Sequence, residues 1–321
     1  MTKSRKILVS VLILAALAAA ALLITRQMTR PPEAARLLPE GDTLIYANLR
    51  PVHVLESNKP AQLEESYKDF IQQTGIQPER DLDEVAFSRQ NTPDGRDVES
   101  SEVFVGRFDR TRTSNYFQKI AAGNERYLDK TIFSIPHEGH TVRVCILTDK
   151  MIAVTNMESA GAMHRIIDRL GTSGGPSLLE THYREVPAAS MAWMITRIPA
   201  KPNGVELPGG MSVSFHQEAV AVASLRYAGA LLFRADFLTQ SEDDARQLTD
   251  SLHTFLALSR SVGQSLGTNG RDPDIKAAFD SVQIQQNGNT AVVTATLPQN
   301  FLKKAVSEIQ LEGNAPPSGK P

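Results

Sequence analysis

The stretch Thr131-Ile-Phe-Ser-Ile-Pro-His-Glu-Gly-His-Thr-Val-Arg-Val-Cys-Ile-Leu-Thr-Asp-Lys-Met-Ile-Ala-Val-Thr155 decides the fold class. It holds three short runs rich in β-branched and apolar residues, which predict three strands. The runs are Thr131–Ile135, Thr141–Leu147 and Met151–Thr155. Glu138-Gly139 and Asp149-Lys150 separate them as tight turns. Because strands joined by such short turns pair antiparallel, this stretch predicts an antiparallel sheet.

The segments on either side predict helices that pack against this sheet. Val103–Phe108 is a further predicted strand, and Ser114–Ala122 has the spacing of a short helix. A second helix is expected from Glu158 to Leu170, where Gly171 ends it. Strand, helix, hairpin and closing helix together make an α+β unit.

The same order of elements returns later in the chain. Ala230–Thr239 is a predicted strand, and Glu242–Ser259 is a helix whose first residue follows the N-cap Ser241. A hairpin turns at Asn287-Gly288, the preferred two-residue turn, and a last helix uses Phe301 to Ile309. We interpret this match of Val103–Leu170 with Ala230–Ile309 as a duplication that gives two related antiparallel-sheet-plus-helix domains.

The Gly/Ser-rich stretch Thr172–Ser177 predicts the boundary between the two domains. With this boundary we expect five segments. Residues 1–30 form a cytoplasmic stub and transmembrane anchor, and residues 31–38 form a linker. Residues 39–171 form the first α+β domain, residues 178–310 form the second, and residues 311–321 form a disordered tail.

The run Ile7–Ile24 predicts an N-terminal transmembrane helix. Ser10 is its only polar residue, and as a helix the run is about 27 Å long against a bilayer core of roughly 30 Å. A long domain after such an anchor is usually exported, so we expect a single-pass membrane protein with an extracytoplasmic C-terminal part. The alternative is a signal peptide cleaved near Ala18–Ala21, but Leu22–Ile24 continue the apolar run past that point.

Charge and cysteine content exclude several classes of partner. Residues 1–30 contain five Lys or Arg and no acidic residue, so 29 of the 34 basic residues and all 36 acidic residues follow, a net charge of −7. An acidic domain of this kind is a poor nucleic-acid binder. The single cysteine, Cys145, allows no intramolecular disulfide and is expected to be a small buried side chain.

Three segments resemble a group of bacterial proteins. Leu37–Leu49, Gly75–Phe87 and Ser241–Leu248, the last followed by Asp272-Pro273 and the Asn-Gly hairpin, are similar to segments of uncharacterised, acidobacterial-type, membrane-anchored envelope proteins. The resemblance implies an N-terminal anchor in the inner (cell) membrane of a bacterium, followed by two such halves. It implies no activity and supplies no site residues.

Gly263-Gln-Ser265-Leu-Gly267 matches the G-x-S-x-G pattern of serine hydrolases. A nucleophile elbow needs a strand before the serine and a helix after it, whereas here a predicted helix precedes it. The last histidine of the chain is His253, so the order Ser…Asp…His is not available either. We expect Ser265 not to be catalytic.

Candidate metal and phosphate sites are equally weak. His137-Glu-Gly-His140 lacks the helical spacing of H-E-x-x-H and is expected in a solvated turn. Asp272-Pro-Asp274 and Glu242–Asp244 could attract a cation, but helix capping explains them. The Gly-Gly pairs at 174–175 and 209–210 lack the strand–helix context of a phosphate loop. The sequence therefore predicts no catalytic residue, no metal site and no cofactor.

These patterns favour a non-catalytic interaction or scaffold module, held to the membrane by Ile7–Ile24, with another envelope protein as its partner. The alternative is a carrier of an apolar ligand such as lipid, bound on a concave sheet lined by Trp193, Phe215 and Phe233. A serine hydrolase acting through Ser265 is the third class.

Overall fold

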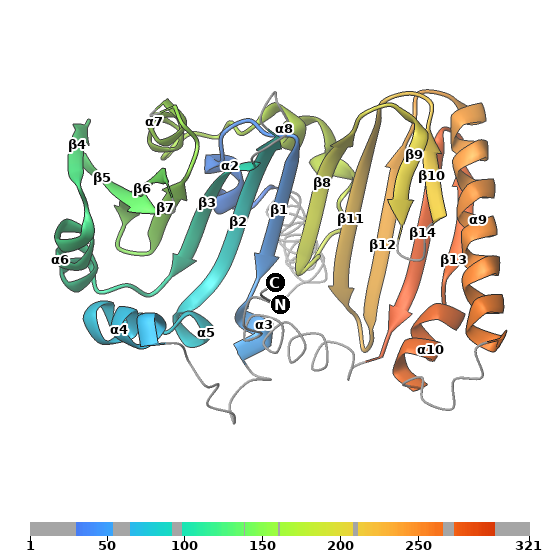
Figure 1. Cartoon of the computed structure of the whole chain (residues 1–321), viewed down its shortest axis with the longest axis horizontal. Helices are drawn as coiled ribbons and strands as arrows, with labels where there is room; N and C mark the ends of the chain where they lie inside the picture. The colour runs from blue at the N-terminus through green and yellow to red at the C-terminus, as the bar shows by residue number, and fades with distance from the viewer. Residues whose placement is uncertain are drawn as a thin grey trace, which may run out of the picture.

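A computed structural model describes residues 30–53, 65–91, 98–137, 139–159, 161–207, 211–265 and 273–298. Twelve strands form one sheet in the order β13-β14-β12-β11-β8-β1-β2-β3-β7-β6-β5-β4 (Figure 1). Every neighbouring pair in it is antiparallel. The predicted α+β class with antiparallel pairing is therefore confirmed.

The strands and helices have the following bounds. The sheet contains β1 Thr43–Asn48, β2 Leu82–Asn91, β3 Val98–Gly106, β4 Gly123–Tyr127, β5 Lys130–His137, β6 His140–Thr148, β7 Met151–Thr155, β8 Ala192–Ile198, β11 Ala219–Tyr227, β12 Leu231–Leu238, β13 Gln283–Asn287 and β14 Thr290–Leu297. A separate pair consists of β9 Lys201–Leu207 and β10 Met211–Phe215. The helices are α2 Glu33–Leu37, α3 Arg50–His53, α4 Glu65–Thr74, α5 Pro78–Asp81, α6 Arg110–Ile120, α7 Gly161–Asp168, α8 Ser177–His182, the 3₁₀ turn Tyr183–Glu185, α9 Glu242–Ser265 and α10 Pro273–Asp280.

The two halves of the sheet have the same order of elements. In the first half, α2 precedes the meander β1-β2-β3, α6 follows it, and the hairpin β6–β7 returns so that β7 lies beside β3. In the second half, α8 precedes β8-β11-β12, α9 follows, and the hairpin β13–β14 returns so that β14 lies beside β12. Strands β4 and β5 extend the first half only.

The halves meet at β1 and β8, the central pair of the sheet. Tyr46 on β1 lies directly opposite Trp193 on β8. The predicted boundary Thr172–Ser177 therefore separates two halves of one continuous sheet. Residues 172–174 are exposed, whereas α8 begins at Ser177 and buries Leu178 and Leu179 in the core.

The segment 31–38, predicted to be a linker, contains the short helix α2 and packs into the core. Ala34, Ala35 and Leu37 on α2 are at most 1% exposed, as is Leu38 after it. Pro32 is the N-cap of this helix, and its carbonyl accepts from the amides of Ala35 and Arg36.

Polar contacts hold this segment to the boundary between the halves. The Glu40 carboxylate accepts from the amide and hydroxyl of Ser177, at 2.9 and 2.8 Å, and from Arg169 at 3.0 Å. The guanidinium of Arg169 also donates to the carbonyl of Leu38. The N-terminal segment, the end of α7 and the start of α8 thus form one connected cluster.

Helices cover both faces of the sheet. The face that we name the α2 face packs against α2, α7 and α8 through leucine, isoleucine and methionine side chains. The opposite face, named the α6–α9 face, packs against Phe117 of α6 at one end and Leu248 of α9 at the other. Figure 1 shows α6 and α9 at opposite ends of the sheet, with β3, β2, β1 and β8 between them.

Within the described ranges, no helix has the length and apolar character needed to cross a bilayer. The predicted anchor Ile7–Ile24, the predicted last helix over 301–309 and the predicted tail 311–321 lie outside those ranges.

Candidate interaction surface

The α6–α9 face carries two long rows of apolar side chains that cross the sheet. Successive residues in each row are cross-strand partners, so they lie on the same face. The first row consists of Phe133, Val144, Val154, Glu102, Phe87, Ile45, Met194, Ala223, Ala235, Val293 and Ile284. The second row consists of Ile146, Ile152, Phe104, Val85, Ala47, Ala192, Leu225, Phe233 and Ala295. Glu102 is the one polar residue in either row.

Among the described residues, one end of the rows joins a helix cluster and the middle joins none. The α6 cluster contains row residues such as Phe133 and Ile152, whereas the α9 cluster contains other residues of the same face, such as Ala219 and Ala291. We name the middle the central floor. It consists of Glu102, Phe87, Ile45, Met194, Phe104 and Ala47, all half-buried, on β3, β2, β1 and β8. An apolar floor of this kind is typical of a surface that binds something.

Glu102 has an unusual environment for a carboxylate. Its cross-strand neighbours are Phe87 on β2 and Val154 on β7. No hydrogen bond or ion pair joins its carboxylate to any residue that the structure describes. Burial raises the pKa of Glu102 above its ordinary value. A half-buried carboxylate without a partner costs free energy, which a bound cation would recover.

The α2 face at the same strands has a different character. Tyr46 and Trp193 stack at 5.6 Å, and Tyr183 meets Trp193 edge-on at 5.6 Å. Burial and the neighbouring Glu84 carboxylate raise the pKa of Tyr46 well above its usual range. The Trp193 indole Nε1 has no hydrogen-bond partner among the described residues, although only 3% of Trp193 is exposed. These aromatic residues form the core between the halves.

The expected ligand-binding aromatics do not line one hollow. Trp193 faces the α2 side, because it pairs with Tyr46 and Ser224. Phe233 belongs to the second apolar row on the opposite face. Phe215 packs against Ala219 and Leu248 beneath α9. The sheet therefore separates Trp193 from Phe215 and Phe233, which both lie on the α6–α9 side.

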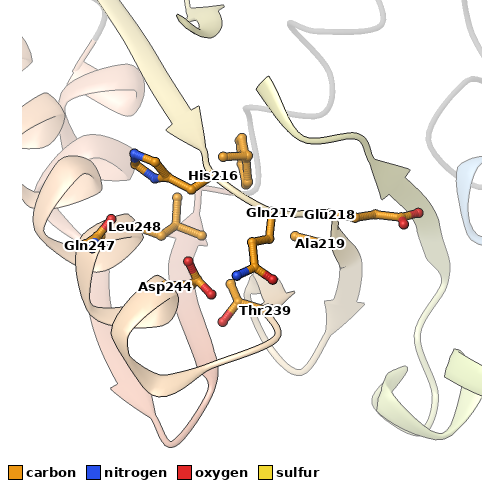
Figure 2. Close-up of a pocket in the computed structure, with 9 residues that line it drawn as sticks. His216, Gln217, Glu218, Ala219, Thr239, Asp244, Gln247 and Leu248 are labelled. Carbon is orange, nitrogen blue, oxygen red and sulfur yellow. The ribbon is translucent and has the colours of Figure 1, made fainter. Parts of the chain in front are cut away.

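A pocket lies beside α9, between the turn before β11 and the N-terminus of the helix. The side chains of Gln217, Thr239 and Asp244 converge on it, with His216 at its rim (Figure 2). Its volume is about 20 Å³, which accommodates a water molecule and is far too small for an acyl chain.

Ser241 caps the N-terminus of α9, as predicted, and it does so together with Asp244. The Ser241 hydroxyl accepts from the Asp244 amide at 3.1 Å and donates to the Asp244 carboxylate at 2.6 Å. His137 and His140 are exposed partners at the β5–β6 turn. Across the described ranges, no group of three or more His, Cys, Asp or Glu residues could hold a metal ion. Asp272 lies outside those ranges.

Ser265 is the last residue of helix α9, so it does not sit on a strand-to-helix elbow. His253 lies twelve residues earlier on the same helix, about 18 Å along its axis. A general base must lie within hydrogen-bond reach of its nucleophile. This geometry therefore separates Ser265 from the histidine that precedes it in sequence.

Cys145 is fully buried within the core on β6, as its position in an apolar alternation predicted. Burial raises the pKa of its thiol to about 12. A thiol in this state is inert at neutral pH, because the thiolate is the reactive form.

Sequence reasoning missed Glu102 and the central floor. Val103, Phe104 and Val105 place apolar side chains on both faces of β3, a pattern typical of a strand covered on both sides. Glu102 interrupts that apolar pattern on one face, and this interruption was the only feature of the sequence that could have indicated the central floor. Its significance depends on the registers of the neighbouring strands, which the local sequence does not contain.

Comparison with known proteins identifies no family for this fold. No protein-family model matches the chain, and no curated protein matches it. Two similar solved structures are crystal forms IV and III of the protein TP0453. Form IV aligns with a TM-score of 0.45 at 13% identity over 85% of this chain and 96% of that chain. Form III aligns with a TM-score of 0.46 at 12% identity over 87% and 99%. Similarities of this size carry no conclusion about function.

Proposed function

We propose that the protein is a membrane-tethered, non-catalytic interaction module that acts outside the cytoplasm in a bacterial envelope, at the inner membrane. The observation that supports this most is the position of α2. The apolar run ends at Ile24 and α2 begins at Glu33, so only residues 25–32 lie between them. Eight residues span at most about 28 Å when fully extended.

A tether this short keeps the sheet close to the bilayer. Because α2 is part of the core, the folded body starts directly at the end of the tether. Such an arrangement suits a protein whose partner is another membrane or envelope protein. The half-buried apolar floor supplies a surface for that partner.

Topology can be tested with a reporter enzyme that is active only outside the cytoplasm, fused after Pro321. We expect an active fusion in the membrane fraction and a mature chain that starts at or near Met1. An inactive fusion would contradict the exported orientation. A mature chain that starts near Leu22 would show a cleaved signal peptide in place of the anchor.

A partner can be sought by in-membrane crosslinking from the central floor. A photoreactive residue in place of Met194 should capture one specific envelope protein, whereas the same residue at the exposed position Leu258 should not. Reaction of a serine-directed probe with Ser265 would instead support the hydrolase alternative.

A further inference from the structure

The central floor combines an apolar surface with one carboxylate, that of Glu102, which has no hydrogen bond or ion pair to the described residues, and this combination restricts what the floor can bind. Its four strands lie about 4.8 Å apart, so β3 and β8 are about 15 Å apart. A helix is about 10 Å in diameter, so one helix fits across these four strands. The floor is therefore large enough for a single helix.

We propose that the central floor binds one helix of a partner protein, apolar on the side that contacts the floor, and that a single lysine or arginine on that side pairs with Glu102. The proposal rests on the interaction function proposed above and names the chemistry of the partner. The apolar residues Phe87, Ile45, Met194 and Phe104 supply the contact area. Glu102 supplies the requirement for a cation.

Charge complementarity favours this occupant over the others. An acyl chain would cover Glu102 without pairing it, and an anionic lipid headgroup would be repelled by it. A second copy placed floor to floor about a two-fold axis would bring a second Glu102 carboxylate to the same interface. The net charge of −7 beyond residue 30 also attracts a basic partner from a distance.

Glu102 is also the group whose environment a partner would change most. Its carboxylate already lies among apolar neighbours, so part of its desolvation cost is present before binding. A charge-assisted hydrogen bond in such a site is stronger than one in water. A misplaced like charge is correspondingly unfavourable, which gives the surface specificity.

The test uses the full chain in lipid nanodiscs and two synthetic helical peptides. Both peptides have alanine and leucine on one side and glutamine on the other; one carries a central lysine within the apolar side and the other a glutamate. We expect the lysine peptide to bind at least about tenfold more tightly, as one charge-assisted hydrogen bond allows. In Glu102→Lys the preference should reverse, and in Glu102→Gln it should disappear.

The matched control is Glu218→Lys, the same charge change at an exposed residue on the turn before β11. It should leave the preference unchanged. Circular dichroism and thermal unfolding establish whether each variant folds. If Glu102→Lys does not fold, Glu102→Gln still tests the proposal.

Four results would overturn the proposal: equal affinity for the two peptides, a lysine preference that survives in both Glu102 variants, binding that appears only after residues 299–321 are removed, or displacement of the peptide by phospholipid vesicles. The third would identify the chain's own C-terminal segment as the occupant, and the fourth would identify lipid. Failure here leaves the reporter assay of the anchor unaffected, so the two proposals fail separately.

Discussion

Tyr46 and Trp193 lie directly opposite each other on the antiparallel strands β1 and β8, with their rings stacked 5.6 Å apart. They are separated by 147 residues in sequence, and each belongs to a different half of the chain. Both are at most 5% exposed. The halves therefore share a sheet and a buried core, and we expect them to unfold as one cooperative unit.

Truncation of Trp193 should destabilise the whole sheet. Trp193→Ala should cost about 3–5 kcal/mol, the range for a large buried aromatic residue. Trp193→Phe should cost much less, because it keeps a ring and removes an N–H without a partner. Urea denaturation followed by circular dichroism measures both. Two separate transitions in the wild type would contradict a shared core.

The apolar stripe of α9 predicts a second difference in stability. The stripe consists of Ala245, Leu248, Leu252, Phe255 and Leu256. Leu252 is at its centre in sequence, but Leu248 is the better buried residue at 3% exposed, and Leu252 is only half-buried. Leu248→Ala should cost about 2–5 kcal/mol and more than Leu252→Ala. Leu258→Ala, at a residue 46% exposed, is the control and should cost under about 0.5 kcal/mol. The opposite order for Leu248 and Leu252 would show that α9 packs with a different face.

Local signals predicted much of the sheet. Gly139 and Gly288 adopt the positive φ angles that their turns require, 83° and 58°, and both hairpins form where the turn residues indicated. Strand β7 has the predicted bounds Met151–Thr155. Strand β4 was missed because Gly123–Tyr127 is polar and mostly exposed, so it carries no apolar alternation. Strand β9 begins Lys-Pro-Asn-Gly and likewise carries none.

Contacts between distant segments could not be predicted. The pairing of β1 with β8 joins residues about 150 positions apart, and no local pattern specifies such a partner. The segment 31–38 was predicted to be a linker, whereas it contains the helix α2, and Leu37 and Leu38 are buried by contacts with distant parts of the chain. Glu102 was overlooked for the same reason, since its neighbours Phe87 and Val154 come from two other strands.

The contact between Glu40 and Ser177 predicts a dependence of stability on pH. Burial opposes ionisation of Glu40, but hydrogen bonds from Ser177 and Arg169 outweigh it and lower the pKa below the ordinary value of 4.5. A lowered pKa stabilises the fold above the unfolded-state value, and this stabilisation is lost as the pH falls through the folded-state value. Glu40→Gln should therefore cost more stability at about pH 7 than at about pH 3. Urea unfolding at the two values measures this. Exposed Glu33→Gln is the control, and an equal cost at both pH values would contradict the role of Glu40.

Cys145 should be unreactive in the folded protein. Its thiol is buried and has a pKa of about 12, so almost no thiolate exists at neutral pH. A maleimide should label it only after denaturation, which mass spectrometry of the intact chain can detect. Rapid labelling of the native protein would show that β6 opens readily or that the core is not closed around it.

The inert Cys145 makes a direct test of the central claim possible, because an introduced cysteine is then the one reactive thiol. Ser173 is exposed in the segment between the halves, so Ser173→Cys adds a reactive group without disturbing the core. Intact spheroplasts are treated with a membrane-impermeant maleimide, and the membranes are then washed at high pH. We expect rapid labelling without permeabilisation and a labelled chain that stays in the membrane fraction. Labelling only after permeabilisation, or release of the labelled chain by the wash, would contradict a tethered extracytoplasmic module.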